Sequence, residues 1–96
     1  MVTLSVKING GTAPIPVHGF VKKLNGDYVD QFEEKLSFDK NYDLPPGKYI
    51  VSVGGMNPEG GFTIVDIEGE FTEDPQPQKL FRRATPVYSV FAVFSV

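Results

Sequence analysis

Glycine and proline interrupt this chain so often that long helices have little room. Ten glycines and eight prolines are spread over 96 residues, and inside a helix a glycine costs about 1 kcal/mol and a proline about 3 kcal/mol. The stretches between them are short, and in them apolar and polar residues alternate, which is the period of a half-buried strand. The spacing therefore predicts an all-β protein.

The stability of such a protein must come from apolar packing. The chain has no cysteine, so neither a disulfide nor a thiolate metal site can support the fold. A hydrophobic fraction of 41%, with eight phenylalanines and four tyrosines, is enough for one core and excludes a disordered chain. We therefore expect a single domain over residues 1–96.

The alternation also places the strands. In residues 2–8 the apolar side chains share one side of the strand, and Asn25-Gly26 is typical of a hairpin turn. Residues 73–78, EDPQPQ, are expected to connect two sheets. About seven strands result, which favours a single antiparallel β-sandwich. The predicted strand segments are 2–8, 17–24, 28–38, 44–55 with its turn, 62–72 and 80–96. Within 28–38, the alternative to a strand is one helical turn from Phe32 to Leu36.

The last segment differs from the others because it is apolar on both sides from Val87 onward. Tyr88 is the first apolar residue on one side of this strand, and Val87, Phe91 and Val93 lie on the other side. A strand of this kind is normally covered on both faces, so we expect it inside its own sheet. The alternative is an edge strand that pairs with another copy of the chain.

Residues 42–53, YDLPPGKYIVSV, resemble the transthyretin-like and carboxypeptidase-regulatory-like β-sandwich families of bacterial secreted and surface proteins. Pro45 and Pro46 fix the backbone of the turn, and a Y-x-V-x-V strand follows. Residues 17–29 are similar to the early hairpin of these families. The resemblance implies a transthyretin-like or immunoglobulin-like sandwich, a fold that serves many unrelated functions.

The residues that could carry catalysis are few. His18 is the single histidine, and its place between Val17 and Gly19 indicates an outward-facing strand residue. The ring-hydrolysing enzymes of the transthyretin-like group use several histidines and a C-terminal Tyr-Arg-Gly-Ser, whereas this chain ends in FAVFSV. Asp66, Glu68 and Glu70 alternate along one strand, which separates their carboxylates instead of gathering them around a cation. We therefore expect no enzyme activity, no cofactor and no metal.

Charge and hydropathy limit the classes of partner that the protein could bind. Nine basic and twelve acidic residues give a net charge of -3, which weighs against nucleic acid as a ligand, and no segment is apolar for long enough to span a membrane. Arg82 and Arg83 are expected to pair with the protein's own carboxylates. A chain without cysteine fits a cytoplasmic protein, if this is the whole gene product, or an extracellular or cell-surface domain excised from a longer chain.

These observations favour a noncatalytic protein-interaction or surface-accessory module, which would bind a protein or the remainder of a larger polypeptide. The loop 54–62 lies at one end of the predicted sandwich, where such folds carry recognition, and three apolar residues share an outward parity that could extend it into a patch. The first alternative is a carbohydrate-binding module in which the rings of Tyr28, Tyr42 and Phe62 stack on the sugars of a polysaccharide. The second alternative is a homodimer or other structural assembly. The candidate contact surface comprises Ile50, Met56, Asn57, Glu59, Phe62 and Ile64.

Overall fold

A computed structural model describes residues 1–96 and shows an all-β protein without helices. It therefore contains no helix that could cross a membrane. Nine strands form where about seven were expected. They are β1 (Val2–Asn9), β2 (Val17–Lys23), β3 (Tyr28–Glu34), β4 (Phe38–Tyr42), β5 (Lys48–Met56), β6 (Phe62–Gly69), β7 (Glu73–Gln76), β8 (Leu80–Arg83) and β9 (Val87–Ser95).

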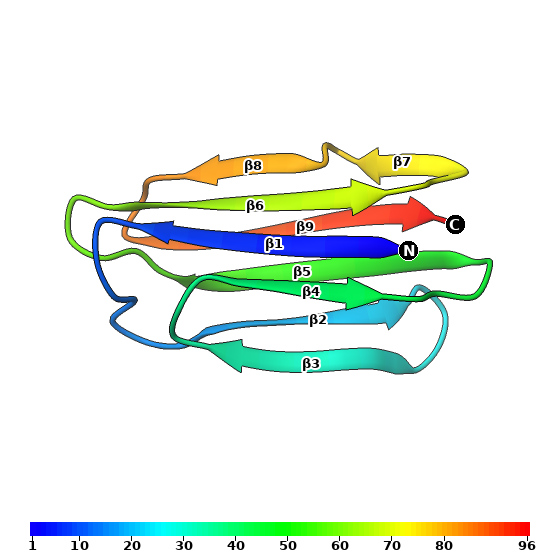
Figure 1. The fold of residues 1–96 in the computed structure, drawn as a ribbon, viewed down its shortest axis with the longest axis horizontal. Coiled ribbons are helices and arrows are strands. Elements are labelled where there is room, and N and C mark those ends of the chain that lie inside the picture. The colour runs from blue at the N-terminus through cyan, green and yellow to red at the C-terminus, as the bar shows by residue number, and fades with distance from the viewer.

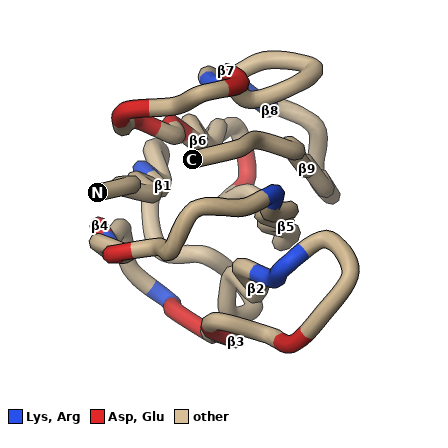
Figure 2. The backbone as a smooth tube through the Cα atoms, turned by 90° about the vertical axis from the view of Figure 1, so that its right-hand side faces the viewer, with Lys and Arg blue, Asp and Glu red and all other residues tan.

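The strands build two antiparallel sheets that pack face to face, which confirms the predicted sandwich. One sheet has four strands in the order β4-β1-β6-β8, and the other has five in the order β3-β2-β5-β9-β7. Figure 1 looks through both layers, and the strands of each run along the long axis of the molecule. Figure 2 looks along the strands toward the end of the sandwich at which both termini lie.

The core lies between the two sheets and follows the predicted alternation. On β1 the buried residues are Val2, Leu4 and Val6, and on β6 they are Thr63, Val65 and Ile67. Facing them from the five-stranded sheet are the inner sides of β2, β5 and β9. The residues buried there are Val17, Val21, Tyr49, Val51, Val53, Tyr88, Val90, Ala92 and Phe94.

Residues 28–38 form a strand as predicted, but the strand ends at Glu34 and the chain then changes sheet. β3 pairs with β2 in one sheet, and β4 pairs with β1 in the other. Leu36 lies at the bend and is 68% exposed, while the hydroxyl of Ser37 accepts a hydrogen bond from the backbone N–H of Ile8. The charged residues that interrupt the apolar pattern in the sequence therefore mark a corner between sheets and not a helical turn.

Residues 73–83 divide between the two sheets in a similar way. β7 pairs with β9 at the edge of the five-stranded sheet, and β8 pairs with β6 at the edge of the four-stranded sheet. In Figure 1 they follow one another along the top of the molecule. The expected connection between sheets is present, although residues 73–76 also pair as a short edge strand.

The predicted hairpin at Asn25-Gly26 joins β2 to β3. Neither turn residue has a positive φ. Instead the N–H of Gly26 donates to the carbonyl of Lys23, and the N–H of Lys23 donates to the carbonyl of Asp27. The glycine thus occupies the last position of a four-residue turn, where it is also favoured.

Gly19 lies in the middle of β2 because two neighbouring strands approach it closely. It is opposite Phe32 of β3 on one side and Val53 of β5 on the other. A Cβ atom at this position would collide with the carbonyl oxygen of Ser52 and lie 2.7 Å from the ring of Phe32. The space that a side chain would need is occupied by the aromatic ring, which covers the glycine from the core side.

Candidate binding surface

The outer side of β9 is not covered, contrary to the expectation from its two-sided apolar pattern. Val87 is 66% exposed and Phe91 is 57% exposed, whereas Tyr88 and Val90 are buried between the sheets. The five-stranded sheet is one layer of a two-layer fold, so none of the nine strands lies over its outer face. A large apolar surface on a monomer commonly marks a binding site.

Cross-strand neighbours extend this apolar surface over three other strands. Phe91 lies opposite Ser52 of β5, which lies opposite Phe20 of β2. Residues paired in this way have Cβ atoms about 5 Å apart on the same face. Val93 lies directly opposite Ile50 on the same side of the sheet. With the ring of Tyr28 from β3, these side chains form a surface that we call the outer patch: Phe20, Tyr28, Ile50, Phe91 and Val93.

Aromatic contacts hold the β3 side of the outer patch. The ring of Tyr28 meets the ring of Phe20 edge to face, with centroids 5.4 Å apart. The ammonium group of Lys22 lies 5.3 Å from the centroid of Tyr28. These contacts fix the Tyr28 ring although it is 52% exposed, so one aromatic anchor of the outer patch is ordered before anything binds.

A shallow groove of about 400 Å³ runs along the neighbouring strands β2 and β3 beside these rings. His18 and Glu33 are opposite one another across the two strands, and Gln31 is opposite Phe20. Imidazole, carboxylate and amide groups therefore border an aromatic floor. The groove combines hydrogen-bonding groups with ring faces, which is the composition of many small-ligand sites.

The structure separates the residues of the predicted contact surface. Ile50 belongs to the outer patch, but Phe62 and Ile64 are on β6 in the other sheet. The three residues therefore face opposite sides of the sandwich and do not form one patch. The guanidinium group of Arg82 lies 4.1 Å from the ring centroid of Phe62 and covers part of it.

The loop residues of that prediction also have different environments. Asn57 is 6% exposed, and its side-chain amide donates to the carbonyls of Arg83 and Thr85 at 3.0 and 2.7 Å. The hydroxyl of Thr63 donates to its Oδ1 atom at 2.6 Å. Asn57 thus ties the loop to the neighbouring chain and is not available to a partner.

Of the other two loop residues, Glu59 is exposed near the tip of the loop. Met56 is half-buried on the outer side of β5, opposite Val87. Met56 therefore continues the apolar surface of the five-stranded sheet toward the loop end, whereas Glu59 remains a solvent-facing charge.

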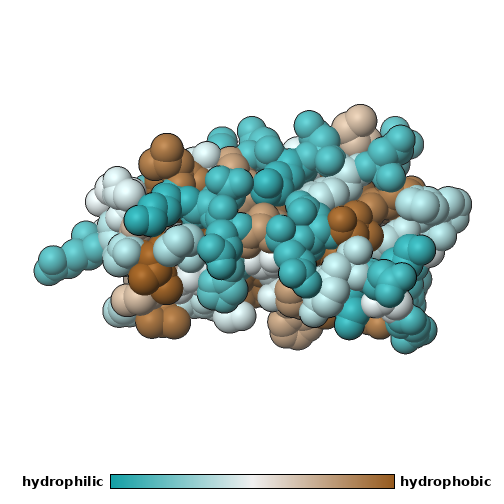
Figure 3. Space-filling view, turned by 90° about the horizontal axis from the view of Figure 1, so that it is seen from below, coloured by the Kyte–Doolittle hydropathy of each residue, from teal (hydrophilic) through white to brown (hydrophobic).

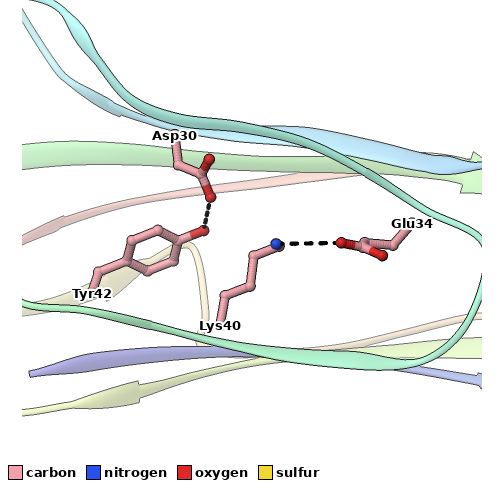
Figure 4. A network of polar contacts seen from close by, with 4 residues as sticks. All are labelled: Asp30, Glu34, Lys40 and Tyr42. Carbon is pink, nitrogen blue, oxygen red and sulfur yellow. Dashed lines mark hydrogen bonds and ion pairs between the residues drawn. The ribbon is translucent and has the colours of Figure 1, made fainter.

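Tyr42, one of the three rings considered for sugar stacking, is buried between the edges of the two sheets. Its hydroxyl donates a hydrogen bond of 2.7 Å to Oδ2 of Asp30, and Lys40 pairs with Glu34 at 3.4 Å alongside it (Figure 4). Burial, together with the neighbouring Asp30 carboxylate, raises the pKa of Tyr42 well above its usual value. Tyr42 therefore closes the open side of the sandwich, and of the three rings Tyr28 alone is more than half exposed.

Arg82 and Arg83 form no ion pair, contrary to the sequence-based expectation. The two ion pairs of the protein are Lys40 with Glu34 and Lys48 with Glu73. The guanidinium groups lie instead over aromatic rings, that of Arg83 at 5.3 Å from the centroid of Phe81. Stacking on a ring keeps the charge at the surface while the side-chain stem covers apolar area.

The acidic residues of β6 do not converge on a site. Burial and the charge of Glu68 raise the pKa of Asp66, and Lys79 and Lys7 offset part of this effect. No three histidine, aspartate or glutamate side chains lie close enough together to hold a metal ion. His18 is exposed on the outer side of β2, at the groove described above.

Comparison of the chain with protein-family models, with curated proteins and with solved structures finds no match.

Sequence reasoning missed three members of the outer patch: Phe20, Phe91 and Val93. A signal for them was present, because Phe20 has the outward parity of His18 and Lys22, and Phe91 has the outward parity of Val87. What the sequence did not supply was the order of strands, which brings β2, β5 and β9 together.

Proposed function

We propose that this protein is a noncatalytic binding module and that a protein segment, from a partner or from the remainder of a longer polypeptide, docks on the outer patch. The observation that carries the proposal is the exposure of Tyr28 and Phe91 in the outer patch, with the exposed Val87 beside it on the same face of the five-stranded sheet. Apolar and aromatic side chains of this kind form the centres of protein interfaces.

The surroundings of the outer patch support the same function. Polar and charged side chains border it on β2 and β3, among them His18, Lys22 and Glu33. An apolar centre with a polar rim is the usual composition of a specific interface. The flat sheet face and the absence of a deep cavity favour an extended or helical protein segment over a small molecule.

Membership of the transthyretin-like or carboxypeptidase-regulatory-like families is part of this proposal. It rests on the Pro45-Pro46-Gly47 turn and the strand that follows it. The turn carries the chain from β4 in one sheet to β5 in the other, and the hydroxyl of Tyr49 donates to the carbonyl of Pro45 at 2.6 Å. Accessory domains with these folds are compatible with a purely binding role.

Photo-crosslinking in the cells that produce the protein tests this function. A photoreactive residue at position 91 is expected to capture a discrete partner, and the same residue at position 62, on the opposite face, is the matched control. The affinity of that partner is then measured with Phe91→Ser, which we expect to weaken binding by at least about tenfold, the effect of losing a central anchor. Equal capture from both positions, or wild-type affinity of the variant, would contradict the proposal.

A polysaccharide is the second candidate ligand, because the groove beside Tyr28 combines ring faces with hydrogen-bonding groups. Sugars stack on exposed aromatic rings and bond to adjacent amides and carboxylates. Binding to a glycan array should be lost in Tyr28→Ala and retained in Phe62→Ala. An array that stays blank with the wild-type protein would exclude this candidate and leave the first one standing.

A further inference from the structure

The edges of the two sheets differ in how they are protected against pairing with other chains. An edge strand presents unpaired N–H and C=O groups, and proteins protect such edges with inward-pointing charges, prolines, bulges or very short strands. The edge strands here are β3 and β7 in one sheet and β4 and β8 in the other. A fifth edge exists along the first half of β9, where β7 does not reach.

The edge formed by β3 and β4 has two of these protections and a hydrophilic surface besides. Asp30, Glu34 and Lys40 point inward between the sheets (Figure 4). The register of β3 against β2 shifts between Val21 and Lys22, which is a bulge. Hydrophilic side chains dominate the surface on this side of the molecule (Figure 3).

β7 and β8 are protected by their length and composition. Each has four residues; β7 contains Pro75, and β8 contains Arg82 and Arg83. β7 is also fixed to its neighbours, because the hydroxyl of Ser95 donates to Glu73 at 2.7 Å and Lys48 pairs with the same carboxylate. These contacts hold β7 against the second half of β9, so that half of β9 has no free edge.

The first half of β9 has none of these protections. Pairing with β7 ends at Gln76 opposite Val93, which leaves residues 87–91 without a neighbour on that side. The sequence there, VYSVF, contains no charge and no proline. Its register against β5 is continuous from Lys48 opposite Ser95 to Met56 opposite Val87, without a bulge. This edge is straight, uncharged and apolar on its outer face.

The directions of the backbone groups on this edge follow from two hydrogen bonds. The carbonyl of Pro86 accepts from Asn57 on the β5 side, and the carbonyl of Ser95 accepts from Thr72 on the β7 side. Because successive residues in a strand point their backbone groups to opposite sides, the odd-numbered residues point theirs to the free edge. Ser89 and Phe91 therefore direct both N–H and C=O outward; Val87 does the same, although its carbonyl already accepts from the Thr85 hydroxyl at 2.8 Å.

We propose that the free edge of β9 binds a second copy of this chain, strand to antiparallel strand, with a two-fold axis at Ser89. This register places Ser89 opposite Ser89 of the second copy and Val87 opposite its Phe91. All three residues that point to the free edge then find partners. The two five-stranded sheets join into one ten-stranded sheet.

The sequence of the edge favours a second copy over an unrelated strand. A two-fold interface must be complementary to itself, and the apolar Val87 and Phe91 stand at equal distances on either side of the small Ser89. Shifting the two-fold axis to Val90 would set Val87 against Val93, whose edge β7 already occupies. With no charge in residues 87–91, two copies also meet without like-charge repulsion.

The dimer does not depend on the proposed function, because it uses the strand edge whereas the partner uses the sheet face. It has a consequence for that face, however. Phe91 belongs to the outer patch, so joining two copies along β9 brings two outer patches together into one continuous apolar surface. The dimer would present about twice the binding area of a monomer.

A single engineered cysteine tests the register. The chain has no cysteine of its own, and residues directly opposite in a hydrogen-bonded antiparallel pair have Cα atoms about 5.5 Å apart, within disulfide range. Mild oxidation of Ser89→Cys should therefore yield a covalent dimer. Ser52→Cys, on the same face but on the interior strand β5, is the matched control and should remain monomeric. Equal crosslinking of the two variants, or none in Ser89→Cys, overturns the proposal.

Proline substitution tests the edge itself. Ser89→Pro removes the N–H that points to the free edge and leaves the hydrogen bonds to β5 in place. We expect the wild-type protein and Ser89→Ala to sediment as concentration-dependent dimers and Ser89→Pro as a monomer, with circular dichroism reporting that each is folded. A folded wild-type protein that stays monomeric at all concentrations, or a folded Ser89→Pro that still dimerises, contradicts the β9 interface.

Discussion

The hydroxyl of Tyr42 donates a 2.7 Å hydrogen bond to Oδ2 of Asp30 across the open side of the sandwich. Tyr42 belongs to β4 in one sheet and Asp30 to β3 in the other. The bond therefore links the two sheets where no strand pairing does. Burial of Tyr42 and the adjacent carboxylate raise its pKa, so the folded state favours the neutral phenol.

Tyr42→Phe is expected to lower the free energy of unfolding by about 1 kcal/mol at neutral pH, because one hydrogen bond is lost. It should also change the pH dependence. Since the folded-state pKa exceeds the unfolded value of about 10, the contribution of Tyr42 is complete below pH 10 and is lost as the pH rises further. Urea denaturation between pH 7 and pH 11 should show a smaller alkaline loss for the variant.

The matched control for this change is Tyr28→Phe, which removes an exposed hydroxyl from the outer patch. It should keep the neutral stability and the alkaline loss of the wild-type protein. An unchanged alkaline loss in Tyr42→Phe would show that the link between the sheets has no role in this pH dependence.

Gly19→Ala should destabilise the protein by at least about 2 kcal/mol, as expected when a packed core is overfilled. The new methyl group would collide with the backbone oxygen of Ser52 and with the Phe32 ring, and a backbone atom in a sheet cannot move aside as a side chain can. Gly26→Ala is the control, because its Cβ would meet no backbone atom and would lie 3.3 Å from Cβ and 3.5 Å from Cδ of Lys23. Thermal unfolding of both variants compares the two positions; equal losses would contradict the close approach at Gly19.

Asn57→Ala should cost about 3 kcal/mol, since three hydrogen bonds are lost and the buried hydroxyl of Thr63 is left without its acceptor. The loop that leads from β8 to β9 should also become more mobile, which hydrogen exchange at the backbone N–H of residue 57 can measure, because this group donates to the carbonyl of Pro86. Asn25→Ala removes an exposed amide at the hairpin turn and is expected to change stability by less than about 0.5 kcal/mol. An Asn57→Ala protein with wild-type stability would show that the three bonds do not hold the loop.

Asp66→Asn should stabilise the protein at neutral pH. Burial and the Glu68 carboxylate raise the pKa of Asp66 in the folded state, so its contribution to stability is complete below the unfolded value of about 3.9 and is lost as the pH rises. The melting temperature of the variant should exceed that of the wild type at pH 7, and the difference should disappear toward pH 3. Asp39→Asn, on the exposed edge strand β4, is the control and should show no such gain.

The side of each strand that faces the core could be predicted from sequence, because the alternation of apolar residues is local. Val51 and Val53 are buried on β5, and Val65 and Ile67 are buried on β6, as the pattern indicates. The same pattern gave Ile50 and Ile64 an outward parity, which the structure confirms.

The neighbours of each strand could not be predicted in this way. Ile50 and Ile64 share a parity but face opposite sides of the sandwich, because β5 and β6 belong to different sheets. Which strands pair depends on contacts between residues far apart in the chain, and parity carries no information about them. For the same reason the exposure of Phe91 was not foreseen, since a two-sided apolar pattern does not tell whether the second side is covered.

The order of strands has a consequence for how the chain reaches its native state. Only β2 and β3 are consecutive strands that pair directly, while each of the other pairs joins segments distant in sequence. Such topologies fold on the order of milliseconds to seconds, since long loops must close before contacts form. β9 is the last strand in the chain and lies between β5 and β7. Until β9 pairs, β5 offers a bare hydrogen-bonding edge, and partly folded chains should be most vulnerable to aggregation at this stage.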